Sequence, residues 1–122
     1  MQTEEQRRFA RLFINVPVTY LILPDGSVEQ SVTRDVGGGG VCLFVDEPLQ
    51  KEALLRVEIK LPEQGPSITF VGEVAWCQEY ELVGKTTGGD VHQDRLIQTG
   101  LKFMQIDPED RKTLLRYCQL SD

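Results

Sequence analysis

Three arginines, Arg7, Arg8 and Arg11, lie close together near the start of the chain. Guanidinium groups bind phosphate oxygens in pairs and stack on flat bases, and a lysine ammonium does both poorly. If the segment is helical or turn-like, Arg7 and Arg11 share one side, because residues four apart are neighbours there. The cluster therefore fits a site for a small phosphorylated ligand, and it fits equally well a solvated basic patch.

A run of glycines from Gly37 to Gly40 follows Asp35 and Val36. Glycine loses more conformational freedom on folding than any other residue, so the run indicates a sharp backbone feature that needs positive φ. A hairpin turn satisfies that need without a ligand, and taken alone it is the favoured interpretation. The alternative is that the missing Cβ atoms let a flat or phosphorylated ligand touch the main chain. The sequence around the run matches neither a Walker loop nor a Rossmann fingerprint.

Little in the sequence points to catalysis or to a metal. The single histidine, His92, alternates with Asp90 and Asp94, so the three could converge on a metal in an extended loop. Metal sites need further ligands and supporting hydrogen bonds, which the neighbouring residues do not supply, so a solvated loop is the better interpretation. No Gly-x-Ser-x-Gly nucleophile motif occurs. We expect neither an enzyme nor a metal site.

Composition sets the class of protein. The chain has 122 residues, which suits one domain, and its net charge of −6 disfavours a general DNA or RNA binder, because such proteins present a basic surface. Cys42, Cys77 and Cys118 are widely spaced, which predicts buried thiols rather than disulfides or a zinc site and fits a cytoplasmic location. The longest clean apolar run, Val41 to Val45, is far below the roughly 20 residues of a membrane span. The polar start of the chain predicts no signal peptide.

Apolar residues alternate along most of the chain, which predicts β-strands. The first strand is expected from Ile14 to Leu23, where every second residue is apolar or aromatic. Pro17 within it favours an edge strand or a bulge. Further strands are expected over residues 28–34, 41–45, 54–61, 68–76 and 97–103. In the 68–76 strand, one face is expected to hold Ile68, Phe70, Val74 and Trp76. The polar stretch 79–95 is predicted to be a loop.

One helix is predicted at the end of the chain, over residues 108–119. Asp107 is placed to cap its N-terminus, Pro108 fits the first helical position, and acidic residues follow in the first turn. Leu114, Leu115 and Cys118 lie at helical spacing and would close one end of a sheet or barrel. Six or so short strands followed by one helix describe a small antiparallel barrel or sandwich.

Together, the arginines and the glycine turn resemble the PilZ domain family, bacterial receptors for cyclic di-GMP. The family pattern is Arg-x-x-x-Arg before the first strand, then Asp/Asn-x-Ser-x-x-Gly between two later strands. Arg7 and Arg11 match the first motif, and Asp35 and Gly40 match the second. The resemblance covers nearly the whole chain. Segments similar to the family's strands occur at residues 16–20, 72–76 and 99–103, residues 48–49 resemble its approach to a strand, and residues 110–111 resemble the opening of its final helix.

The resemblance implies a fold and a division of the chain. The fold would be all-β with one helix, a six-stranded antiparallel β-barrel of the PilZ-like split-barrel type with a C-terminal α-helix. Residues 1–13 would be a flexible N-terminal arm that carries the Arg-x-x-x-Arg motif, and residues 14–122 would form the barrel and the helix. Ligand binding would order the arm over the barrel, a switch that can create or hide a partner surface.

The resemblance also implies a site for cyclic di-GMP, without a further cofactor or a metal. Arg7 and Arg11 would hold phosphates and guanine edges, because arginine meets guanine O6 and N7 bidentately. Arg8 would be an additional contact or a stacking group. Asp35 would accept hydrogen bonds from guanine N–H groups, and Gly40 would permit close approach of the ligand.

The chain departs from the family pattern at Gly37, where the family has serine. One hydroxyl hydrogen bond to the ligand is lost, worth roughly 0.5–1.5 kcal/mol, or about two- to tenfold in affinity. The Gly37 amide stays available, so the change weakens the site without abolishing it. The 79–95 stretch is also longer than the corresponding loop of such domains. It is either a loop that contacts a partner or a tolerated insertion.

Three functions are therefore compared. The favoured one is a single-domain cyclic di-GMP receptor or adaptor that relays a conformational change to an unidentified protein partner. The second is a PilZ-fold interaction module that has lost nucleotide binding, which Gly37 supports. The third, an oligonucleotide-binding barrel, is disfavoured by the acidic charge and by the scarcity of aromatic residues on the strands. We expect no DNA or RNA partner and no membrane insertion.

Overall fold

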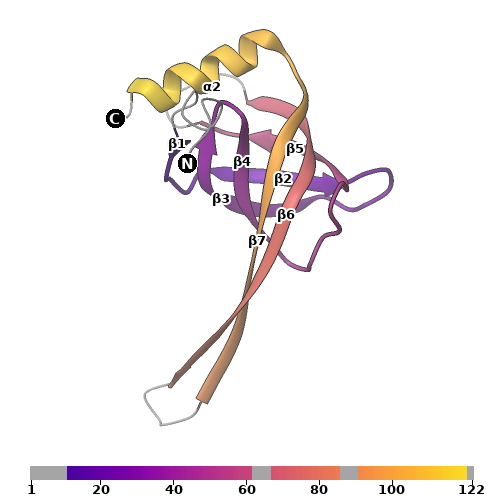
Figure 1. Cartoon of the computed structure of the whole chain (residues 1–122), viewed down its shortest axis with the longest axis vertical. Coiled ribbons are helices and arrows are strands. Elements are labelled where there is room, and N and C mark those ends of the chain that lie inside the picture. The colour runs from indigo at the N-terminus through magenta and orange to yellow at the C-terminus, as the bar shows by residue number, and fades with distance from the viewer. Residues whose placement is uncertain (1–10, 62–66, 86–90, 121–122) are drawn as a thin grey trace, which may run out of the picture.

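The computed structural model describes residues 11–61, 67–85 and 91–120 (Figure 1). Each pair of neighbouring strands is antiparallel. In chain order the elements are β1 (Arg11–Leu12), β2 (Pro17–Ile22), β3 (Glu29–Gly37), β4 (Gly40–Val45), β5 (Leu54–Ile59), β6 (Ile68–Lys85), β7 (Val91–Ile106) and α2 (Pro108–Leu120).

The strands close into a barrel. The sheet runs β3-β2-β5-β6-β7-β4, and a further pairing of β3 with β4 joins its two ends. This closure confirms the predicted six-stranded antiparallel barrel with one C-terminal helix. The short strand β1 is added to β3 beyond the reach of β2, through the pairs Arg11↔Gly37 and Leu12↔Val36.

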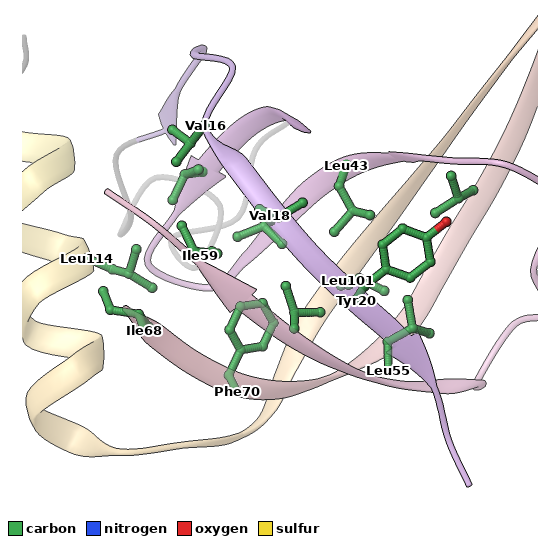
Figure 2. Packing of buried hydrophobic residues seen from close by; sticks show 14 of the residues in the cluster. Val16, Val18, Tyr20, Leu43, Leu55, Ile59, Ile68, Phe70, Leu101 and Leu114 are labelled. Atoms are coloured by element: carbon green, nitrogen blue, oxygen red, sulfur yellow. The ribbon is translucent and has the colours of Figure 1, made fainter. Parts of the chain in front are cut away.

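The core lies inside the barrel, where alternate residues of each strand meet. On β5, Leu55, Val57 and Ile59 are fully buried, while the residues between them face outward. Figure 2 shows that side chains from several strands point into one shared interior, and that Leu114 of α2 lies at its end. Burying each large aliphatic side chain contributes about 1.5–3 kcal/mol, so this interior is the main source of stability.

Helix α2 begins where the sequence predicts. The Asp107 carboxylate Oδ1 accepts a hydrogen bond from the backbone N–H of Glu109 at 2.8 Å, the geometry of an N-cap. Leu114 and Cys118 are buried, and the Cys118 thiol donates to the Val36 carbonyl at 3.4 Å. The helix therefore covers one end of the barrel at β3.

The predicted loop at 79–95 is wrong. Strand β6 continues to Lys85 and β7 starts at Val91, and the two pair residue by residue from Glu79↔Ile97 to Lys85↔Val91. Residues 86–90 of the predicted loop lie outside the described residues. They project from the barrel as a two-stranded ribbon (Figure 1). A ribbon that leaves the barrel lines no barrel interior, so the alternation that marks a barrel strand is missing. The missing alternation is why the sequence reads as a loop.

Two of the three residues considered for a metal site fall in this ribbon. His92 and Asp94 belong to β7, opposite Gly84 and Leu82, and Asp90 lies outside the described residues. Within the described residues, no group of three histidine, cysteine or acidic side chains is arranged to hold a metal ion.

Two predictions about individual residues are corrected. Trp76 does not share the face of Val74: the register shifts between them, so Val74 is 1% exposed and Trp76 39% exposed. Pro17 marks neither an edge strand nor a bulge, because β2 lies between β3 and β5 and pairs with both in regular register. As the first residue of β2, Pro17 holds a position where strands tolerate proline.

The structure can be compared with two expectations from the composition, one on the cysteines and one on membrane-spanning segments. All three cysteines are free, and Cys42 and Cys118 are buried as predicted, whereas Cys77 is only half-buried. In the part of the chain that the structure describes, no helix has the length and apolar character needed to cross a bilayer.

Candidate functional site

Arg11 and Asp35 come together in the structure, although they lie 24 residues apart. The pairing of β1 with the end of β3 places Arg11 beside Gly37, close to Asp35 on the same strand. The Arg11 Nε donates to Asp35 Oδ1 at 3.0 Å, and Nη2 contacts the same oxygen. One arginine of the first predicted motif thus meets the acid of the second. Arg7 and Arg8 lie outside the described residues.

A second arginine binds the other oxygen of Asp35. The Arg34 Nε donates to Asp35 Oδ2 at 2.8 Å, and this hydrogen bond raises the pKa of the Arg34 guanidinium above its ordinary value. Asp35 is fully buried, and a buried carboxylate is costly unless its charge is paired. Arg11 and Arg34 supply that pairing, and their side chains keep 47% and 38% of their surface exposed.

Asp35 belongs to a row of neighbouring residues that crosses β3, β4, β7 and β6. Asp35 pairs with Cys42, Cys42 with Gly100, and Gly100 with Trp76. The indole of Trp76 lies directly on Gly100, since a Cβ at Gly100 would stand 2.2 Å from the Trp76 Nε1. The small residues Cys42 and Gly100 therefore form a low floor between Asp35 and Trp76. Burial raises the pKa of the Cys42 thiol to about 11, so this floor carries no charge at neutral pH.

Arg34 extends across this floor. Its Nη1 donates to the Gln98 Oε1 at 2.7 Å, and its Cζ lies 5.7 Å from the centroid of the Trp76 ring, within cation–π range. Sequence reasoning missed Arg34, Gln98 and Trp76. The one available signal was a further arginine, Arg34, directly before Asp35. The bulge that turns Trp76 outward leaves no mark in the apolar pattern.

The glycine run forms the turn between β3 and β4. Gly37 ends β3 and Gly40 begins β4. A Cβ at Gly40 would lie 2.0 Å from the Leu101 carbonyl oxygen, so the approach of β4 to β7 requires glycine there. The turn is held from two sides: the Gly38 carbonyl accepts from the Arg111 Nε at 3.1 Å, and the Gly39 carbonyl accepts from the Phe103 N–H at 3.3 Å. The glycine run is therefore explained by a hairpin turn that packs closely on β7. The role of Gly37 and Gly40 toward a ligand stays a prediction.

These groups suit one kind of ligand. Two partly exposed guanidiniums can bind phosphate oxygens or the acceptor edge of a base, and a carboxylate can accept hydrogen bonds from N–H donors. An indole beside them offers a flat apolar surface. A molecule with phosphates, flat rings and N–H donors matches all three.

The fold is shared with solved structures at low sequence identity, and one of them is a PilZ domain. The PilZ domain with c-di-GMP of YcgR from Escherichia coli matches with a TM-score of 0.70 and 15% identity, covering 94% of this chain and 90% of that one. The inhibitor of motility MotI/DgrA of Bacillus subtilis gives 0.69 and 19%, covering 100% of this chain and 54% of that one. The K. pneumonia MrkH–c-di-GMP complex gives 0.66 and 19%, covering 99% and 52%. The chain spans about half the length of MotI and MrkH.

The sequence itself identifies the family. A search of curated proteins finds no match to this chain. The family model of the PilZ domain matches residues 5–120, which includes both predicted motifs and every described strand and the helix. The chain therefore belongs to the PilZ domain family.

Proposed function

We propose that this chain is a cyclic di-GMP receptor without catalytic activity, which acts as an adaptor in the cytoplasm. Binding changes its conformation, and a partner protein reads the change. The observation that carries the proposal is the contact of Arg11 with Asp35, which joins the two motifs into one site beside the glycine turn.

The chemistry of guanine fits this site. The Asp35 carboxylate accepts hydrogen bonds from the N1–H and N2–H donors of one guanine, and Arg11 turns from Asp35 toward guanine O6 and N7 or a phosphate. Both Asp35 oxygens already hold an arginine, so guanine takes the place of Arg11 at Oδ1 and shares Oδ2 with Arg34. From the motif alone, Arg7 holds the second phosphate or guanine and Arg8 adds a contact. The Gly37 amide and the small Gly40 border the ligand.

The position of Arg11 supplies a route for the conformational change. Arg11 lies in β1, which is attached to β3 by two residue pairs only. When Arg11 moves to the ligand, this short strand and the segment that precedes it are repositioned against the barrel. A partner that contacts this segment then distinguishes the bound from the free protein.

The solved neighbours support a receptor that acts through others. One is a PilZ domain with c-di-GMP, one is an inhibitor of motility, and MrkH is described as a c-di-GMP-dependent transcription regulatory factor. Their identities of 15–19% establish the shared fold, so the ligand and the partner remain parts of the proposal.

The second candidate is an interaction module that has lost the nucleotide. Its support is specific: Gly37 lacks the family's hydroxyl, and both Asp35 oxygens are satisfied within the protein. It requires that cyclic di-GMP leaves the protein unchanged. A partner that is recovered only in the presence of cyclic di-GMP would eliminate this candidate.

Replacing Arg11 with alanine tests the proposal. We expect Arg11→Ala to weaken cyclic di-GMP binding at least tenfold in calorimetric titration at pH 7, because a bidentate arginine–guanine contact is worth about 1–3 kcal/mol. Arg56→Ala is the matched control, since Arg56 is an exposed arginine on β5. If wild-type protein binds and Arg11→Ala binds equally tightly, the ligand site is elsewhere.

A further inference from the structure

We propose that Arg34 is a stacking platform for one purine base of the ligand, on the outer surface of β3, β6 and β7. The Arg34 platform consists of Arg34, its anchor Gln98 and the ring of Trp76 that supports it. The inference rests on the proposed function, because it assigns a base of the bound cyclic dinucleotide to a residue outside the two family motifs.

The guanidinium of Arg34 is fixed in orientation. Its Nε–H and Nη1–H bonds lie in the guanidinium plane, and they end on Asp35 Oδ2 at 2.8 Å and Gln98 Oε1 at 2.7 Å. Two hydrogen bonds from different nitrogens define the tilt of that plane. The acceptors are themselves held in place, since Asp35 is fully buried and Gln98 is 8% exposed. A base that stacks on Arg34 therefore meets a group that is already ordered, so little side-chain entropy is lost on binding.

The Arg34 guanidinium lies against Trp76 and stays partly exposed to solvent. The centroid of the Trp76 ring lies 5.7 Å from the Arg34 Cζ. The indole is packed on Gly100, so it cannot move closer to the sheet. The Arg34 side chain nevertheless keeps 38% of its surface exposed, so part of it is open to solvent. A planar, weakly hydrated cation that is partly exposed is a surface on which purines stack.

Neutralising Asp35 does not account for this arrangement. Arg11 already binds Asp35 Oδ1, and Arg34 needs only its Nε to bind Oδ2. The contacts with Gln98 and Trp76 leave the charge of Asp35 unchanged and instead hold the plane of the guanidinium across the floor of Cys42 and Gly100. The contact with Gln98 satisfies a buried side-chain oxygen and also fixes the orientation of Arg34, as a surface for a flat group requires.

The test separates the shape of the guanidinium from its charge. Arg34→Lys keeps the positive charge and removes the plane, whereas Gln98→Met keeps every charge and removes one in-plane anchor. Stacking of one base changes affinity by roughly five- to a hundredfold. In calorimetric titration with cyclic di-GMP we expect Arg34→Lys to bind at least fivefold more weakly than wild type and Gln98→Met about threefold or more. Arg116→Lys, an exposed helix position, is the matched control and keeps wild-type affinity.

The single tryptophan gives a second readout. Trp76 is the only tryptophan of the chain, so its emission reports on the platform directly. Saturating cyclic di-GMP is expected to change Trp76 emission in wild type and to change it by less than half as much in Arg34→Lys, with circular dichroism confirming the fold of each variant.

The outcomes distinguish this inference from the proposed function. If wild type binds and both Arg34→Lys and Gln98→Met bind within twofold of it, with an unchanged emission response, the platform is wrong and the receptor function stands. If wild type gives no saturable binding at all, the proposed function fails and the platform fails with it.

Discussion

Asp35→Ala is expected to weaken cyclic di-GMP binding by two to four orders of magnitude. In the proposed complex the buried carboxylate accepts two N–H groups of one guanine. Hydrogen bonds to a charged group are worth about 1.5–3 kcal/mol each, so losing both costs about 3–6 kcal/mol, or roughly 10²- to 10⁴-fold in affinity. Calorimetric titration of wild type and variant measures this loss.

The controls for Asp35 separate binding from folding. Asp35→Asn keeps the size of the side chain and one acceptor oxygen, so its affinity is expected to fall between that of wild type and Asp35→Ala. Arg11 and Arg34 are partly exposed and become solvated when Asp35 is removed, so both variants retain a cooperative thermal transition. If Asp35→Ala binds within threefold of wild type, Asp35 does not contact the ligand.

Gly40→Ala is expected to destabilise the barrel by about 3 kcal/mol or more. The added Cβ would lie 2.0 Å from the Leu101 carbonyl oxygen, a backbone atom held in the β4–β7 ladder, so relief requires moving a strand. Overpacking usually costs 1–3 kcal/mol, and a clash with backbone belongs at the upper end or beyond. For a domain of this size the melting temperature should fall by roughly 10 °C or more, measured by circular dichroism or calorimetry.

The matched control for Gly40 is the residue opposite it on β7. Lys102 pairs with Gly40 in register, and its side chain makes an ion pair with Glu73 at the surface. Lys102→Ala should cost less than about 1 kcal/mol, because exposed ion pairs contribute little. A Gly40→Ala protein with wild-type stability and lost ligand binding would show that the glycine serves the ligand and not the packing of β4 on β7.

The barrel could be predicted from the sequence because its strands have one buried face. Residues such as Leu55, Val57 and Ile59 alternate with polar ones, and that period of two is what a barrel interior imposes. The projecting ribbon of β6 and β7 could not be predicted in this way. Neither of its faces is buried in the barrel, so hydrophobic alternation has no cause to appear there.

The sequence predicts the site residues that belong to a motif, and it does not predict those whose positions depend on a β-bulge. Arg11 and Asp35 belong to the two family motifs, and the structure brings them together. Trp76 was placed on the face of Val74 because the sequence does not reveal the extra residue that shifts the register between them. Arg34 lies at a different register shift, between Thr33 and Asp35 where β3 pairs with β4, and the sequence does not reveal that shift either.

Gly40 shows that the packing of the fold can require a motif residue independently of any ligand. The family pattern assigns it to the approach of a ligand, whereas the structure shows that the β4–β7 pairing requires the missing Cβ. Strand packing of this kind arises between residues about 60 positions apart and leaves no local signal. Matching a motif therefore does not separate binding residues from residues that shape the turn.

Titration of the wild-type protein with cyclic di-GMP tests the central claim most directly, with cyclic di-AMP and GMP as controls. The account predicts saturable heat and a change in Trp76 emission with cyclic di-GMP. It predicts neither with cyclic di-AMP at the same concentration, because adenine lacks the O6 acceptor and the N1–H and N2–H donors that Arg11 and Asp35 would engage. GMP, with one base and one phosphate, should bind far more weakly. Absence of both heat and emission change at high cyclic di-GMP concentration would contradict the account.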